Sequence, residues 1–343
     1  MNVLVDRHHA GLYRSLQLLG DRLGWTLYTP VGLDWMTERY WAFGMNAGIT
    51  ADLAQQYLVP HEGVWRGDDD FHRGLWRTRD PEFPGVDIHG VPLDVARSMT
   101  WAFVIATLDD DQWGFHRFAQ ETGARYVVQV GNTGQYVDWS LDPLAIVSSE
   151  VPIRGRGILY HQEMDPAATK WSDPDDADHG IVSSFVNCFP SIGPCHDLWQ
   201  EAQAQAPDME FREFGIDGNR GVTKPIKRLR GLMARSMFGW HDKVHGDGFG
   251  HVIHGWAAVG RPIIGHASHY RGRMAEHLWQ HGVTAIDLDL VTIPEAARMV
   301  QDIAGDPDRH AAMCHAIRAE YDRIDHDAEA RAIADLLGTA VPA

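Results

Sequence analysis

The amino-acid sequence predicts an α/β protein made of two domains, each with an open, mainly parallel sheet. Its 343 residues exceed the size at which a single hydrophobic core usually stops growing, which favours two domains. Short apolar runs alternate along the chain with helical patterns, and this alternation is typical of α/β folds. Gly180 ends an acidic, proline-containing loop, so we place the domain boundary there. The predicted domains span 1–180 and 181–337.

The expected strands are short apolar runs bounded by polar or glycine-containing segments. In the first domain these runs are 2–5, 25–32, 101–108, 125–131 and 144–149. In the second domain they are 181–189, 209–215, 237–240, 261–265 and 284–289. The region from Asp34 to Pro92 is rich in Trp, Gly and Pro and has no clean assignment. The tail from Pro294 to Leu337 is expected to be almost entirely helical.

Composition places the chain among ordinary globular proteins, because 44% of its residues are hydrophobic and 22% are charged. No apolar run approaches the ~20 residues that a membrane span requires. The first run, NVLV, is too short and is followed by residues too polar for a secretory signal. Three cysteines without metal-ligand spacing indicate reduced thiols. We therefore expect a cytoplasmic protein, of a bacterium or an infected host cell, without integral membrane association.

The net charge of −17 opposes non-specific attraction to nucleic acid over most of the surface. The densest positive cluster lies between Lys224 and Arg235. Its simplest interpretation is a solvated helix face. A local basic face of this kind nevertheless leaves DNA open as a partner.

The segment HGDGFGH, residues 245–251, predicts an anion-binding loop. Its glycines allow close backbone approach, and an apolar helix pattern begins directly after it. A helix N-terminus offers N–H groups and the positive end of the helix dipole, which suits a diphosphate. Gly260 then ends the helix, and Pro262 leads into the next strand. A tight connection without a ligand is the alternative interpretation.

The run 247–264 resembles the C-terminal motif of GT-B glycosyltransferases, in which an acid-Gly-Phe-Gly loop leads into a helix and a proline-containing strand. The matching positions are Asp247, Gly248, Phe249, Gly250, Ala258, Gly260 and Pro262. Over 181–337 the resemblance rests on the motif and on the order of the flanking elements. Over the first half it rests only on the α/β architecture. It implies two Rossmann-like domains that face one another across a cleft, with C-terminal helices that cross back to the first domain.

The same resemblance implies transfer of a sugar from a nucleotide diphosphate donor, expected to be a UDP-sugar, to an acceptor hydroxyl. No metal and no cofactor besides the donor are expected. The acceptor could be a glycan or small molecule, or a hydroxymethylated base in DNA as in phage-type DNA glycosyltransferases. Two alternatives stay open at this point: a sugar-nucleotide epimerase on the same fold, and a non-catalytic nucleotide-sugar-binding protein.

One position departs from the motif of the family. Members with two acids place the second eight residues after the first, where it binds the ribose hydroxyls. That position is Gly255 here, with His254 beside it. His254 is therefore the candidate for the donor nucleoside, and a partly buried helix histidine is the alternative interpretation.

The candidate general base is His8 or His9, because these residues and Asp6 directly follow the first strand. A base near neutral pKa can take the proton of an acceptor hydroxyl. A loop pair with no role in catalysis is the alternative. Asn132 and Thr133 follow another strand and are candidates for acceptor contacts, and a plain turn is the alternative interpretation.

The donor diphosphate needs N–H groups and cations. We expect them from Gly246 to Gly250 and from Arg220 or Lys224, and Lys243 lies just before the loop. His251 and His254 would share a helix face, but no third ligand stands at a defined spacing. The sequence therefore predicts no metal site.

Overall fold

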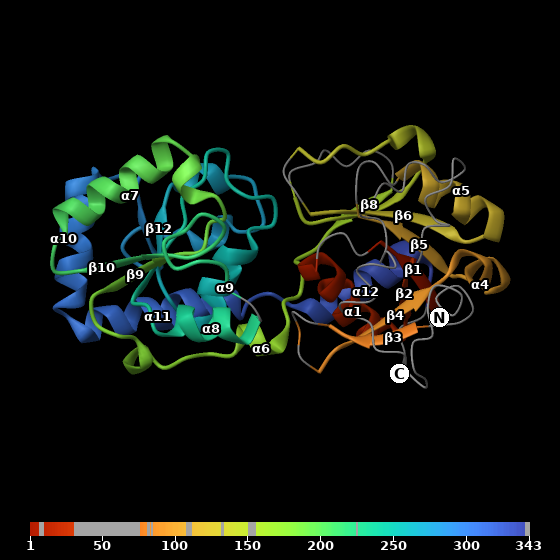
Figure 1. Ribbon diagram of the computed structural model, residues 1–343, viewed down its shortest axis with the longest axis horizontal. Coiled ribbons are helices and arrows are strands. Elements are labelled where there is room, and N and C mark those ends of the chain that lie inside the picture. Colours follow the sequence, from red (N-terminus) through yellow and green to blue (C-terminus); the bar gives the residue numbers. More distant parts are fainter. Residues whose placement is uncertain are drawn as a thin grey trace. The chain divides into compact units, whose positions relative to one another are not determined.

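The computed structural model describes residues 1–6, 10–30, 76–80, 83, 85–107, 112–131, 134–149, 156–223 and 226–339. The chain divides into two compact units (Figure 1). Unit 1 contains Met1–Asp165 and His326–Ala343, and unit 2 contains Pro166–Asp325. No helix in the described parts has the length and apolar character that crossing a membrane requires.

Unit 1 contains a sheet with the strand order β3-β4-β2-β1-β5-β6-β7-β8. Its strands are β1 (Asn2–Val5), β2 (Thr26–Pro30), β3 (Trp76–Arg79), β4 (Asp87–Val91), β5 (Phe103–Ala106), β6 (Arg125–Val130), β7 (Leu144–Val147) and β8 (Gly157–Leu159). Every described pair of neighbours is parallel except β3 and β4, which are antiparallel. The five predicted strands of this half are confirmed. The sequence missed β8, and it left β3 and β4 unassigned.

Helices cover both faces of the first sheet. They are α1 (Ala10–Leu23), α4 (Leu93–Ser98), α5 (Gln112–Thr122) and α12 (His326–Leu337), together with the short 3₁₀ helix η3 (Trp139–Leu141). Val3 packs with α1 and α12 on one face, whereas its neighbour Leu4 packs with α4 and α5 on the other. This follows from the alternation of side chains along a strand, and it explains why the central strands are apolar throughout.

Unit 2 contains a fully parallel sheet with the order β10-β9-β11-β12-β13. Its strands are β9 (Ile181–Ser184), β10 (Glu210–Glu213), β11 (Phe238–Trp240), β12 (Ile263–Gly265) and β13 (Ala285–Asp287). Each lies inside a run that the sequence predicted. The helices are α6 (Pro166–Thr169), α7 (Pro194–Gln205), α8 (Ile226–Ala234), α9 (His251–Val259), α10 (Ile293–Ala304) and α11 (Pro307–Tyr321). Short 3₁₀ helices are η4 (Pro174–Asp176), η5 (Phe189–Ser191), η6 (Ala267–Tyr270) and η7 (Glu276–Leu278).

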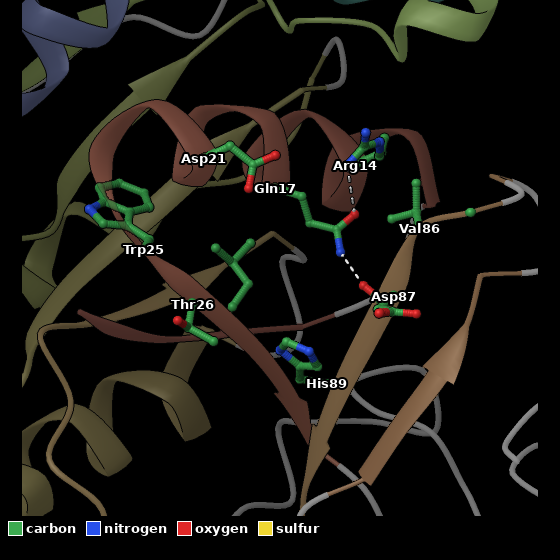
Figure 2. A pocket seen from close by; sticks show the side chains of 10 residues that line it. Arg14, Gln17, Asp21, Trp25, Thr26, Val86, Asp87 and His89 are labelled. Carbon is green, nitrogen blue, oxygen red and sulfur yellow. Dashed lines mark hydrogen bonds between the residues drawn. The ribbon is translucent and has the colours of Figure 1, made fainter. Parts of the chain in front are cut away.

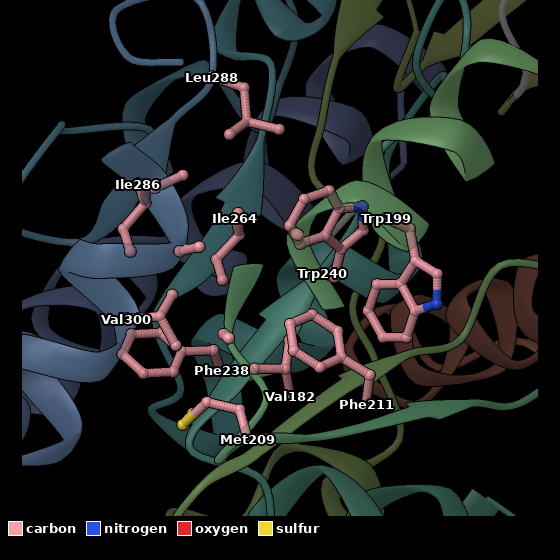
Figure 3. Close-up of a cluster of buried hydrophobic side chains, with 14 of the residues drawn as sticks. Val182, Trp199, Met209, Phe211, Phe238, Trp240, Ile264, Ile286, Leu288 and Val300 are labelled. Carbon is pink, nitrogen blue, oxygen red and sulfur yellow. The ribbon is translucent and has the colours of Figure 1, made fainter. Parts of the chain in front are cut away.

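Tryptophans fill the core of unit 2 on both faces of the sheet. Trp199 of α7 lies edge-on to Trp240 of β11 at 5.6 Å and to Phe211 at 4.8 Å between ring centroids (Figure 3). On the other face, Trp256 of α9 packs directly on β11. A Cβ atom at Gly239 would lie 2.3 Å from the Trp256 ring, so α9 reaches this position only because residue 239 has no side chain. The strand and the helix that flank the predicted anion loop are therefore fixed against each other.

The division between the units lies at Asp165, which differs from the boundary expected at Gly180. The residues between these two positions are bound to unit 2 through the buried side chain of Arg261. Its guanidinium donates to the carbonyl oxygen of Ser172 at 3.1 Å and to that of Asp173 at 2.8 Å. A buried arginine requires such partners. The acidic, proline-containing loop is thus part of unit 2 and does not mark its border.

The last helix, α12, belongs to unit 1, so the second domain ends before the predicted bound at residue 337. The return of a C-terminal helix to the first domain is what the resemblance implied. Ile333 and Leu337 are fully buried in the same cluster as the first strand. Glu329 accepts hydrogen bonds from the backbone N–H of His161 at 2.9 Å and contacts the Nδ1 atom of that histidine at 2.6 Å. Burial would raise the pKa of Glu329, but the partners His161 and His326 prevail and hold it at about 2.

Replacing Glu329 with Gln should therefore destabilise unit 1 near neutral pH. The pKa of this carboxyl is lower in the folded chain than its ordinary 4.5, so its contribution is present above that value and lost as pH falls toward about 2. We expect a loss of about 2 kcal/mol in the free energy of unfolding. Urea unfolding of both proteins at several pH values measures it.

The difference between the wild type and E329Q should shrink as the pH is lowered, because both side chains are then neutral. Asp94→Asn is the control, since Asp94 pairs with Arg97 on the exposed surface of the same unit. If the difference in the free energy of unfolding between the wild type and E329Q stays constant with pH, the lowered pKa of Glu329 is contradicted.

Candidate functional site

Polar side chains of unit 2 gather where its parallel strands end. Ligands of open α/β sheets bind beyond this carboxyl edge. Three strands contribute here, because β11, β12 and β13 lie side by side and lead directly into charged segments. The residues concerned are His241, Asp242, Asp247, His266, His269, Asp287 and Asp289.

The predicted anion loop connects β11 to α9. Gly246 and Gly250 adopt positive φ angles of 66° and 81°, and Gly250 is the N-cap of α9. The backbone N–H of His254 donates to the Gly250 carbonyl at 3.0 Å and so closes the first helical turn. The N–H groups of this turn point toward the loop, together with the positive end of the helix dipole. The positive φ angles thus let the loop turn directly into the N-terminus of α9.

Asp247 is held by two basic neighbours. His241, which is buried, contacts the Asp247 carboxylate through Nε2 at 2.8 Å, and the Lys243 ammonium donates to the other carboxylate oxygen. Burial opposes ionisation, but His241 and Lys243 outweigh it and hold the pKa of Asp247 well below its ordinary range. Asp247 thus holds the Lys243 ammonium in place, and the Lys243 side chain remains 34% exposed.

The segment that follows β12 lies directly against this loop. The Arg273 guanidinium donates to the carbonyl oxygen of His245 at 2.5 Å and to that of Asp247 at 3.1 Å. A Cβ atom at Gly246 would come within 2.6 Å of the His269 carbonyl oxygen. Arg273 therefore holds the loop through two of its backbone carbonyls, and the loop packs closely against His269.

A second cluster surrounds the fully buried carboxylate of Asp242 at the end of β11. His266 Nδ1 lies 2.8 Å and His269 Nδ1 3.5 Å from Asp242 Oδ1. Burial acts to raise the pKa of Asp242, yet the two histidines hold it at about 2, and Asp242 in turn raises the pKa of His266. Burial, reinforced by Asp242, raises the pKa of the neighbouring Cys195 thiol to about 12.

The predicted loop residues come together, but they are unequally accessible. Gly246 and Asp247 are partly exposed, whereas Gly248, Phe249 and Gly250 are buried. The accessible half of the loop is therefore its first half. His254 is fully buried, its Nδ1 lies 3.0 Å from the Gly250 carbonyl oxygen, and its ring stacks on Phe249 at 4.0 Å. This placement fits the interpretation of His254 as a buried helix residue.

The structure does not bring Arg220 to the loop. Its guanidinium pairs with Glu210 at 2.9 Å, at the amino end of the edge strand β10. In unit 1, Asp6 is buried and accepts hydrogen bonds from the backbone N–H of Thr107 at 3.0 and 3.1 Å. This bond ties the carboxyl end of β1 to that of β5. Other predicted site residues lie outside the described residues: His8, His9, Asn132, Thr133 and Lys224.

Sequence reasoning missed His241, Arg273 and the cluster around Asp242. A usable signal existed for some of them, because His241 and Asp242 directly follow one predicted strand and His266 directly follows another. Polar residues at these positions face the carboxyl edge in any parallel sheet. Arg273 follows no strand, and no spacing in the sequence links it to the loop.

A cavity of about 590 Å³ in unit 1 lies elsewhere (Figure 2). It is lined by α1, β2 and β4, and Gln17 of α1 donates to the Asp87 carbonyl at 2.8 Å. Thr26 and Asp87 stand at the starts of their strands. The cavity therefore borders the amino edge of the first sheet, opposite the edge where ligands of such sheets bind.

Comparison with known proteins gives likenesses in structure only, since no family model and no curated protein matches the sequence. Anabaena HepE in complex with UDP-glucose is 14% identical, with a TM-score of 0.59 over 98% of this chain and 99% of that one. Sucrose-phosphate synthase from Thermosynechococcus elongatus is 12% identical, with a TM-score of 0.61 over 98% and 97%. An alpha-glucosyltransferase in complex with UDP and a 13-mer DNA containing a HMU base is 9% identical, with a TM-score of 0.61 over 98% and 99%.

At these identities the likeness shows the fold. The chain has the GT-B fold, with two α/β units that each contain a parallel-stranded sheet and a last helix that returns to the first unit. The fold class predicted from the glycine loop and the order of elements is confirmed.

Replacing Gly246 with Ala should distort the loop. The residue has φ 66°, and the added Cβ would lie 2.6 Å from the His269 carbonyl oxygen, which belongs to the backbone. We expect a loss of about 2–4 kcal/mol in the stability of unit 2, from backbone strain and overpacking together. Thermal and denaturant unfolding measure this loss.

Gly272→Ala is the matched control, because Gly272 has φ 74° with no atom within 4 Å of an added Cβ. This substitution should cost only the backbone strain, about 1 kcal/mol. Equal effects of the two substitutions would show that the contact with His269 does not shape the loop.

Proposed function

We propose that this protein is a glycosyltransferase that moves a sugar from a UDP donor to an acceptor hydroxyl. The observation that carries the proposal is the glycine loop at the carboxyl edge of β11, which leads into the N-terminus of α9. Solved proteins of the same fold hold UDP or UDP-glucose. In the reaction the bond between the sugar C1 atom and the phosphate oxygen breaks, a bond from C1 to the acceptor oxygen forms, and a base takes the hydroxyl proton.

The leaving diphosphate gains negative charge as its bond to the sugar breaks. We propose that the N–H groups of the loop and of the first turn of α9 meet this charge, together with the Lys243 ammonium. Lys243 is suited to this role, since Asp247 holds its ammonium beside the accessible half of the loop. Lys224 remains a second candidate from the sequence, whereas the pairing of Arg220 with Glu210 leaves it at the far edge of the sheet.

A panel of nucleotide sugars in a thermal-shift assay tests donor binding, because a ligand that binds only the folded chain raises its apparent stability. UDP-sugars should raise the unfolding midpoint more than the matching sugars on other nucleotides. Transfer is then measured as release of UDP in the presence of candidate acceptors. A new sugar formed from donor alone would instead favour an epimerase. No stabilisation by any nucleotide sugar would overturn the proposal.

Lys243→Met should weaken UDP binding about 10–100-fold, which is the value of one charge-assisted hydrogen bond. Calorimetric titration with UDP measures it. Lys227→Met is the matched control, since Lys227 is an exposed lysine of α8 within the basic stretch of the sequence. Equal affinities in K243M and the wild type would remove Lys243 from the diphosphate site.

We propose His8 or His9 as the base. Asp6 is a poor alternative, because its carboxylate is buried and bonded to Thr107. His8→Ala and His9→Ala are tested separately for transfer and for UDP affinity. One of them should lower the transfer rate about 100–10,000-fold, the usual contribution of a general base, with UDP affinity retained. Full activity in both variants would place the base elsewhere.

The acceptor has two candidate classes. A glycan or small molecule fits the net charge of −17, whereas one solved protein of this fold is bound to DNA. Titration of binding to duplex DNA with salt separates them, because contacts to phosphates weaken steeply as salt rises. Absence of salt-dependent binding at low ionic strength would exclude the DNA class.

A further inference from the structure

We propose that unit 2 contains a binding site for a divalent transition metal of the Zn²⁺ class, formed by Asp242, His266 and His269. The three residues come from the end of β11, the end of β12 and η6. The inference departs from the absence of metal expected from the sequence, which considered other histidines. It stands on the geometry of this cluster and not on the proposed sugar transfer.

The separations between the ligand atoms suit a small cation. One ligand atom of each residue lies within 4.8 Å of the other two. His266 Nδ1 and His269 Nδ1 are 2.8 Å and 3.5 Å from Asp242 Oδ1. In a tetrahedral site with bonds of about 2.0–2.1 Å, neighbouring ligands stand about 3.3 Å apart. The observed distances lie on both sides of this value, so small side-chain movements would complete the coordination.

Two buried atoms of the cluster lack hydrogen-bond partners among the described residues. They are Asp242 Oδ2 and His269 Nδ1. Asp242 is fully buried, and an unsatisfied polar atom or a charge in the interior is unfavourable unless a partner compensates it. A metal ion would give the imidazole nitrogen a partner and neutralise the carboxylate at once.

The surroundings favour a cation over an anion. Asp287 accepts from the backbone N–H of Ala267 at 3.0 Å, and Asp289 accepts from that of Ser268 at 2.6 Å. These carboxylates fix the backbone between the two histidines, and both Nδ1 atoms lie beside Asp242 Oδ1. They also add negative charge near the site. Outer groups of this kind orient metal ligands and support binding.

The donor set indicates the class of metal. Two imidazoles and one carboxylate suit Zn²⁺ and similar transition metals, whereas Mg²⁺ and Ca²⁺ prefer sites made of oxygen atoms. The side chains of His266 and His269 are 22% and 26% exposed, which gives an ion a route to the site. Three protein ligands leave a fourth position for water or an oxygen of a bound ligand.

Cobalt is the probe for the test, because tetrahedral Co²⁺ absorbs visible light strongly. The full chain is freed of metal with a chelator and titrated with Co²⁺, without any donor. His266→Gln and His269→Gln are compared with His315→Gln, an exposed histidine of α11. This control is needed because the chain has 20 histidines. We expect one tight site in the wild type and H315Q, and an affinity more than about 100-fold lower in H266Q and H269Q.

Thermal unfolding with and without Zn²⁺ provides a second measurement. The ion should raise the midpoint of the wild type and H315Q but not that of the other two variants. If H266Q fails to fold, H269Q decides, since His269 Nδ1 stands farther from Asp242, at 3.5 Å against 2.8 Å for His266 Nδ1, and makes no well-aligned hydrogen bond among the described residues. Absence of a tight site in the wild type, or an unchanged site in H269Q, would overturn the proposal. Neither result bears on sugar transfer, because no donor is present.

Discussion

The close packing of α9 on β11 is the constraint on which the functional half of the structure depends. Gly239 offers no side chain, so the Trp256 ring lies directly on the strand. This contact fixes the helix close to the sheet, and its N-terminus lies at the carboxyl edge because the chain enters α9 from the end of β11. The connecting loop must then turn sharply, which it does through positive φ angles at Gly246 and Gly250. A bulkier residue at 239 would displace the helix and with it the N–H groups of its first turn.

Charge pairs hold the loop in the conformation that this packing allows. His241 and Lys243 bind the two carboxylate oxygens of Asp247. Arg273 donates to the backbone carbonyl oxygens of His245 and Asp247. These interactions are partly buried, where they are stronger than on the surface. The acid of the motif therefore holds the Lys243 ammonium beside the loop, and we propose that this ammonium meets the diphosphate.

The carboxyl edge of unit 2 has two electrostatic parts. The loop offers Lys243 and N–H groups to an anion, whereas Asp242, Asp287 and Asp289 surround two histidines with negative charge. The two parts touch, because the Gly246 backbone lies against the His269 carbonyl. A metal at the histidines would add positive charge beside the proposed diphosphate site. Binding of UDP and binding of metal would then strengthen each other by the same factor, as coupled equilibria require.

The sequence by itself determined the α/β class, ten of the strands and the connection between loop and helix. The alternation of apolar runs and the glycine motif are local signals, so they can be recognised without knowing the tertiary structure. It could not determine the boundary at Asp165, because the buried Arg261 binds carbonyls far away in the chain. Nor could it show that His254 points into the core. Only the tertiary structure decided that Asp242, His266 and His269 meet, since parallel strands distant in sequence end at one edge and bring their last residues together.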